Sequence, residues 1–151
     1  MSGMLTASSA TPFTVYDSAN VSMQAPAPPI SGVFASRPNV IGDPNAGPHT
    51  PDQWVSRDAF QRLDPVADAG KFGNAGRNIV RGPSFLDLDL VLARTFPLGA
   101  QRTVQFRLEV LNATNHTNFS LPVDDLASPN FGRILDAGAA RVVQFGLRLQ
   151  L

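Results

Sequence analysis

The sequence predicts an all-β protein of antiparallel strands with long irregular loops, and three stretches of alternating side chains are the main reason. In residues 103–112 the even positions from 104 to 110 are apolar, and the odd positions between them are polar or charged. Side chains of a strand point alternately to its two faces, so each such stretch has one apolar and one polar face. Residues 85–96 and 141–151 repeat the pattern, and a short turn at 97–101 joins the first two stretches as a hairpin.

The two faces of these strands are the candidate functional surfaces. The apolar face consists of large aliphatic and aromatic residues, namely Leu86, Leu88, Leu90, Leu92, Val104, Phe106, Leu108, Val110, Val143, Phe145, Leu147, Leu149 and Leu151. The polar face carries Asp87, Asp89, Gln105, Arg107, Glu109, Gln144 and Arg148. Arg94 breaks the pattern by falling among the apolar positions. A long arginine near a strand end can extend its charged group to a polar boundary, so one exception is compatible with the prediction.

The rest of the chain is predicted from composition. Residues 1–17 include Thr, Val, Phe and Tyr, which suit a pleated surface, and form one possible strand. Residues 18–84 are predicted to be a long Pro- and Gly-rich loop, with flexible joints at Gly73, Gly76 and Gly82. Within it, Thr50-Pro51-Asp52-Gln53 has the residues of a helix N-terminus and predicts a helical turn. Residues 113–140 are a second long loop, with a possible short strand at 131–135.

Composition excludes several classes of function. The formal net charge is zero, so no electrostatic capture of nucleic acid is expected, and the absence of cysteine excludes disulfides and thiolate metal sites. Asp87 and Asp89 could form a carboxylate pair for acid–base chemistry, but a solvated or arginine-paired face is the preferred interpretation. His49 and His116 lie in separate loops and make a poor metal site. We therefore expect no enzymatic activity, no metal and no cofactor.

Alternation alone leaves two architectures open. In a soluble β-sandwich, serving as an interaction or carbohydrate-binding module, the apolar face would pack on a second sheet. In an outer-membrane barrel it would face lipid, and the polar face would line the lumen. Two features favour strands of a transmembrane β-barrel, about four of them. The strand lengths match the roughly 9–11 residues that cross a bilayer, and the connections alternate between long and short, as in barrels with long external loops and short periplasmic turns.

A series of short motifs carries a family resemblance. In order, they are FGNAGRNIVRGP (72–83), LDL (88–90), FRLEVLN (106–112), NHTNF (115–119), SPNFGRI (128–134) and QFGL (144–147). This series resembles the C-terminal end of TonB-dependent outer-membrane receptors, specifically the Oar-like group that carries a carboxypeptidase-regulatory-like domain. The resemblance covers about residues 70–151.

The resemblance implies a place in the bacterial outer membrane and a structural role in a ligand-uptake channel. Members of the family are large barrels with an internal plug, gated by a TonB-type energy-transducing partner. This chain has no recognisable signal peptide or plug, so it is expected to be a C-terminal fragment that is not transport-competent alone. Its expected partners are outer-membrane lipid on the apolar face and the remaining barrel strands and plug of the parent receptor. The TonB-type protein would be reached only through the missing N-terminal part.

Overall fold

The computed structural model describes residues 1–18, 36–64, 66–99 and 101–150. Every named strand in these residues pairs antiparallel, and the only helical element among them is a 3-10 turn, η1 (Arg57–Ala59). The chain divides into two compact units, which are described separately below. The sheet unit comprises Met1–Ser9, Ser84–Phe119 and Ala137–Leu151. The loop unit comprises Ala10–Pro83 and Ser120–Asp136.

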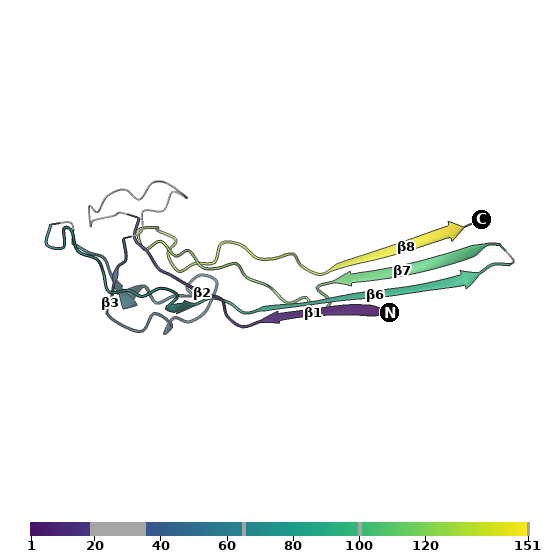
Figure 1. Cartoon of the computed structure of the whole chain (residues 1–151), viewed down its shortest axis with the longest axis horizontal. Coiled ribbons are helices and arrows are strands. Elements are labelled where there is room, and N and C mark those ends of the chain that lie inside the picture. Colours follow the sequence, from purple (N-terminus) through teal and green to yellow (C-terminus); the bar gives the residue numbers. More distant parts are fainter. Residues whose placement is uncertain (19–35, 65, 100, 151) are drawn as a thin grey trace. The chain divides into compact units, whose positions relative to one another are not determined.

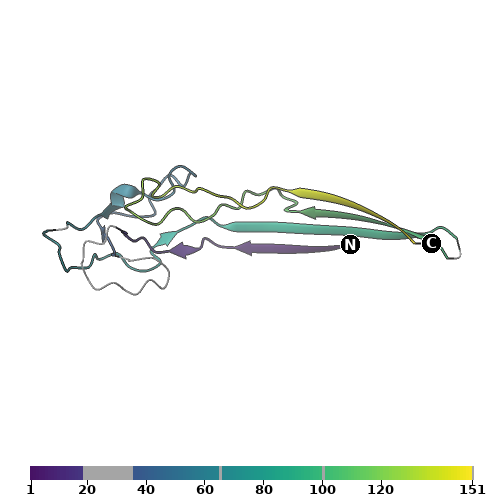
Figure 2. The same ribbon diagram turned by 90° about the horizontal axis from the view of Figure 1, so that it is seen from above.

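The sheet unit is built on four long strands in a single layer (Figures 1 and 2). They are β1 (Ser2–Ser8), β6 (Phe85–Pro97), β7 (Thr103–Leu111) and β8 (Val142–Gln150), in the spatial order β1-β6-β7-β8. The predicted fold class is confirmed: the protein is all-β with antiparallel strands. Strands β1 and β8 are the two edges of this sheet within the described residues, so the sheet is not closed into a barrel.

The register brings like residues together on each face of the sheet. Leu92 lies opposite Leu108, which in turn lies opposite Phe145. On the other face Thr95, Gln105 and Arg148 form a polar row, whereas Val91 lies opposite Glu109 as an apolar exception. Because the side-chain period of a strand is two, a slip of one residue would mix apolar and polar side chains on both faces. The alternation in the three stretches therefore specifies this register.

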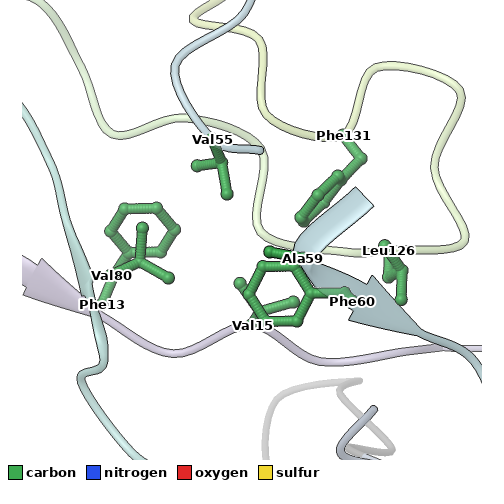
Figure 3. Close-up of a cluster of buried hydrophobic side chains, with 8 residues drawn as sticks. All are labelled: Phe13, Val15, Val55, Ala59, Phe60, Val80, Leu126 and Phe131. Atoms are coloured by element: carbon green, nitrogen blue, oxygen red, sulfur yellow. The ribbon is translucent and has the colours of Figure 1, made fainter. Parts of the chain in front are cut away.

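The loop unit has a hydrophobic core of its own, although it contains only short strands. These are β2 (Pro12–Phe13) paired with β5 (Val80–Arg81), and β3 (Asn39–Val40) paired with β4 (Phe60–Gln61). The core side chains come from distant parts of the sequence, as Figure 3 shows: Phe13, Val15, Val55, Ala59, Phe60, Val80, Leu126 and Phe131. Most of these residues were predicted to lie in irregular loops, whereas Phe13 and Val15 come from residues 1–17, predicted to form one possible strand. Residues 19–35 of the predicted loop lie outside the described residues.

Two local predictions are wrong. Thr50 and Gln53 do not begin a helix. Their backbone groups bond reciprocally at N–O distances of 3.2 and 3.1 Å, which closes a tight turn, and the helical turn η1 begins later, at Arg57. Residues 131–135 do not form a strand, because Phe131 ends a turn from Ser128 and places its ring in the core.

Candidate functional site

The apolar face of the sheet unit collects the side chains that the alternation predicts. The register aligns all the predicted apolar positions of β6, β7 and β8 from Leu86 to Leu149 on one face; Leu151 lies outside the described residues. Several of these side chains are widely exposed, with exposed fractions of 72% for Phe145, 76% for Leu147 and 56% for Leu149. Contiguous exposed apolar surface of this kind marks a binding or membrane-contacting region.

Strand β1 extends the apolar face, and sequence reasoning missed its contribution. Leu5 lies opposite Leu88, between Gly3 and Ala7, which lie opposite Leu90 and Leu86. Glycine and alanine carry little apolar bulk, so the alternation in this strand is weak in the sequence. Pairing with β6, and not the local pattern, reveals the role of Leu5.

Arg94 is the one charged residue on the apolar face among the described strand residues. It lies in a row with Phe106 and Leu147. The guanidinium carbon of Arg94 is 5.4 Å from the centre of the Phe96 ring, a cation–π distance. The side chain is exposed, and the ion pairs found in the described residues do not include it.

The polar face is lined by the residues predicted for it. Gln105 lies opposite Arg148, and Glu109 lies opposite Gln144. Along β7, the Nε atom of Arg107 donates to Glu109 Oε1 at 2.8 Å. This pair is partly exposed, so its contribution to stability is small. The arrangement gives a hydrophilic surface directly behind the apolar one.

At the end of the sheet where β6 begins, a cavity of about 280 Å³ with a mostly apolar lining lies within the sheet unit. Its lining includes Asp87, Asp89, Asn112 and Asn118. The backbone amide of Asn112 donates to Asp89 Oδ1 at 3.0 Å, whereas the Oδ1 atom of Asp87 is buried without a hydrogen-bond partner. The expectation of a solvated or arginine-paired face does not describe this pair: Asp89 is held by a backbone amide, and Asp87 turns one oxygen into the protein.

The NHTNF motif (115–119) and Asn112 build this end of the sheet. Asn112 is buried and has a left-handed backbone, with φ of 48°. Its Nδ2 donates to the carbonyls of His116 at 2.9 Å and Ala139 at 3.2 Å, and its Oδ1 accepts from the His116 amide at 3.0 Å. Asparagine tolerates this backbone region and can bond its own neighbouring chain, so the motif is a structural corner that ends β7.

Each histidine has its own local contact within its unit. His49 packs edge-on against Trp54, with ring centres 5.3 Å apart, and the Nδ1 atom of His116 lies 3.0 Å from Asn118 Oδ1. Across the described residues there is no group of three or more His, Cys, Asp or Glu that could hold a metal ion.

The loop unit contains an open cleft of about 460 Å³ that sequence reasoning did not find. Arg57, Phe60, Arg62 and Leu126 are among its lining residues. Arg62 is already engaged, because its Nε and Nη2 atoms donate to the buried Asp17 carboxylate at 2.7 and 3.0 Å. This hydrogen-bonded ion pair raises the pKa of Arg62 further. Asp17 and Arg62 are far apart in the sequence, so no local sequence pattern predicts their ion pair.

Comparisons with known proteins assign the family. None of the helical segments in the described residues has the length and apolar character needed to cross a membrane. No curated protein and no solved structure matches the chain. A family model described as an outer membrane beta barrel domain matches residues 1–144, which is nearly the whole chain, and this membership indicates an outer-membrane location. The chain therefore belongs to the outer membrane beta barrel domain family.

Proposed function

We propose that the sheet unit is a segment of the wall of a TonB-dependent receptor barrel, and that it serves as a structural part of a ligand-uptake channel. The observation that carries the proposal is the division of one single-layered sheet into an apolar and a polar face by an unbroken register. A barrel wall needs this division because lipid lies on one side of it and the lumen on the other.

The apolar face, from Leu86 to Leu149 on β6, β7 and β8, would contact acyl chains, with Leu151 continuing the pattern. The polar residues from Asp87 to Arg148 would face the lumen. Burying apolar side chains in hydrocarbon is favourable by roughly 25 cal/mol per Å² removed from water. Residues as exposed as Phe145 and Leu147 would gain most from this transfer.

The two edges of the sheet support the proposal that further strands complete the wall. The outer N–H and C=O groups of β1 and β8 have no strand beside them in the described residues. In hydrocarbon each unsatisfied backbone group costs several kcal/mol, so both edges must pair with further strands there, those of the parent receptor or, for the isolated chain in vesicles, those of other copies. We therefore propose that the chain acts as a fragment of a larger barrel and does not transport ligand by itself.

The connections support an orientation. The connection from Pro97 at the end of β6 to Thr103 at the start of β7 is short, and the Leu98 amide donates to the Arg102 carbonyl at 2.8 Å. Residues 9–84 and 112–141 form long connections at the opposite ends of the strands. In outer-membrane barrels short turns face the periplasm and long loops face outward. The loop unit would then be exposed to the cell exterior.

The receptor assignment rests on the motif series, and it defines the proposed partners. These are outer-membrane lipid, the remaining strands and plug of the parent receptor and, through the part of the receptor outside this chain, a TonB-type energy-transducing protein. The proposal includes no enzymatic step, no cofactor and no nucleic-acid partner, as composition, motif spacing and the net charge of zero predict. The soluble sandwich alternative would require a second sheet over the apolar face. The other sheets of the described residues are pairs of two-residue strands.

Neighbouring positions on β8 allow a direct test, because the chain has no native cysteine to interfere with labelling. Val143→Cys and Gln144→Cys place a fluorescent probe on the apolar and polar faces of one strand. The chain is refolded into vesicles whose lipids carry bromine on their acyl chains. We expect strong quenching at position 143 and weak quenching at position 144. Equal quenching at the two positions, or none at 143, would refute the proposed orientation of the sheet.

A further inference from the structure

The Arg94 guanidinium lies on the apolar face without a hydrogen-bond acceptor among the described residues. Its row neighbours are Phe106 and Leu147, and along β6 it lies between Leu92 and Phe96. A guanidinium carries five N–H donors and remains charged under all ordinary conditions. In the described residues no hydrogen bond from these donors is found, and the Phe96 ring at 5.4 Å is the contact that the group makes. An arginine in this setting needs an anionic acceptor from outside the sheet.

The depth of Arg94 indicates where that acceptor lies. Arg94 is three residues from Pro97, the last residue of β6. At about 3.3 Å per residue this is roughly 10 Å along the strand, and about 7–8 Å across the bilayer for a strand tilted by about 40°. An extended arginine side chain covers a comparable distance. With the end of β6 at the membrane boundary, as the proposed function requires, the guanidinium reaches the headgroup level of the leaflet at the turn end of the strands, and not that of the other leaflet.

We propose that Arg94 binds the phosphate group of a phospholipid in the leaflet at the turn end of the sheet, with Phe96 supporting the guanidinium from one side. The inference rests on the proposed function, because it requires the apolar face to contact lipid. Charge complementarity selects the occupant: the guanidinium fork pairs well with phosphate oxygens, and phosphates are the anions present at that depth. The site would fix the height of the sheet in the bilayer.

The test compares insertion of the full chain into two neutral bilayers with brominated acyl chains, one of phosphatidylcholine and one of a digalactosyl lipid that lacks phosphate. The probe at Val143→Cys reports insertion, since this position lies in the row of Leu90 and Val110, away from Arg94. The insertion constants are measured with the native residue at 94, with Arg94→Gln, and with Arg148→Gln. The last variant removes an equal charge near the same end of the sheet, but on the polar face.

We expect the chain with Arg94 to insert about tenfold more favourably into phosphatidylcholine than into the digalactosyl lipid, since a hydrogen bond to a charged group contributes about that factor. Arg94→Gln should abolish the preference, and Arg148→Gln should retain it. Adding inorganic phosphate to the digalactosyl vesicles should not restore insertion.

Four results would overturn the inference. The preference could be absent, it could survive in Arg94→Gln, or it could disappear equally in Arg148→Gln, which would indicate a non-specific charge effect. Restoration by inorganic phosphate would identify a free-anion site instead of a lipid site. Failure of the proposed function is distinguishable from all four, because the Val143 probe would then remain unquenched in both bilayers.

Discussion

The side-chain amide of Asn118 forms hydrogen bonds with both backbone groups of Leu86, as a neighbouring strand would. Its Oδ1 atom accepts from the Leu86 amide at 2.9 Å, and its Nδ2 atom donates to the Leu86 carbonyl at 2.9 Å. Strand β7 ends at Leu111, and its paired register with β6 stops at Leu90, so Leu86 has no β7 partner. The side chain satisfies both backbone groups there, and β6 can extend beyond its neighbour.

Replacing Asn118 with alanine should therefore loosen the start of β6. Loss of both hydrogen bonds leaves the partly buried backbone groups of Leu86 unsatisfied, at a cost of about 1–3 kcal/mol. Amide hydrogen exchange at Leu86 should accelerate accordingly, while exchange at Leu108 in the middle of β7 stays slow. Thr117→Ala changes the exposed neighbour and serves as the control. Unchanged exchange at Leu86 would show that Asn118 does not stabilise the strand.

Charge placed on the apolar face should prevent insertion, and charge on the polar face should not. Phe145→Arg puts a cation in the row of Leu92 and Leu108, where the expected cost is about 2–4 kcal/mol near the middle of a bilayer. Gln144→Arg, one residue away, should cost less than about 1 kcal/mol. Urea unfolding of the two variants in lipid vesicles measures the difference. Equal costs would contradict the assignment of the faces.

Acid should loosen the turn around Asp64 in the loop unit. The amides of Ala67 and Val66 donate to its carboxylate at 2.8 Å each and lower the pKa of Asp64. The Asp64 amide and the Lys71 ammonium likewise lower the pKa of Asp68. Because both folded values lie below the unfolded value of about 3.9, their contribution is complete above that pH and is lost as the pH falls through the folded values.

Amide chemical shifts of Val66 and Ala67, recorded by NMR between about pH 6 and pH 2, should follow this titration. Asp64→Asn keeps an acceptor oxygen but cannot titrate near pH 4, so most of the pH dependence at these amides should disappear. If the variant and the native chain show the same profile, the carboxylate of Asp64 is not the group that holds the turn.

A methyl group at Gly73 should destabilise the loop unit. A Cβ atom there would lie 2.1 Å from the Arg37 carbonyl oxygen and 2.2 Å from that of Pro38, and both obstacles are backbone. Gly42→Ala is the matched control, because its Cβ would first meet Ala59 at 3.4 Å, an ordinary contact distance. Thermal unfolding followed by the single tryptophan, Trp54, should show a clear loss for Gly73→Ala and little change for Gly42→Ala. A similar melting temperature for the two variants would argue against the close packing at Gly73.

The sequence predicted the sheet better than the loop unit, for a physical reason. Pairing of β6, β7 and β8 follows from a local period of two, which any single strand displays. The core of the loop unit joins Val15, Val55, Val80 and Leu126, residues that share no period and are separated by long stretches of chain. Gly73, predicted to be a flexible joint, instead allows two backbone segments to approach closely. Such long-range packing leaves little trace in local composition.

The residues of the candidate surfaces were likewise only partly predictable from the sequence. The apolar and polar residues of each strand could be predicted because alternation assigns them, whereas Leu5 required the pairing of β1 with β6. The roles of Asn112 and Asn118 could not be derived from composition, because they depend on left-handed backbone and on the unequal lengths of β6 and β7. The NHTNF motif could be recognised in the sequence, but its structural role at the ends of β6 and β7 could not be predicted from it.

The directions of the edge strands β1 and β8 limit the number of further strands that can close the barrel wall. Each of the three pairings in the order β1-β6-β7-β8 is antiparallel, so β1 and β8 run in opposite directions. If a closed ring keeps this alternation throughout, the number of strands inserted between β8 and β1 must be even. A cylinder with an odd total would force one parallel seam, so a fully antiparallel barrel that contains this sheet has an even total.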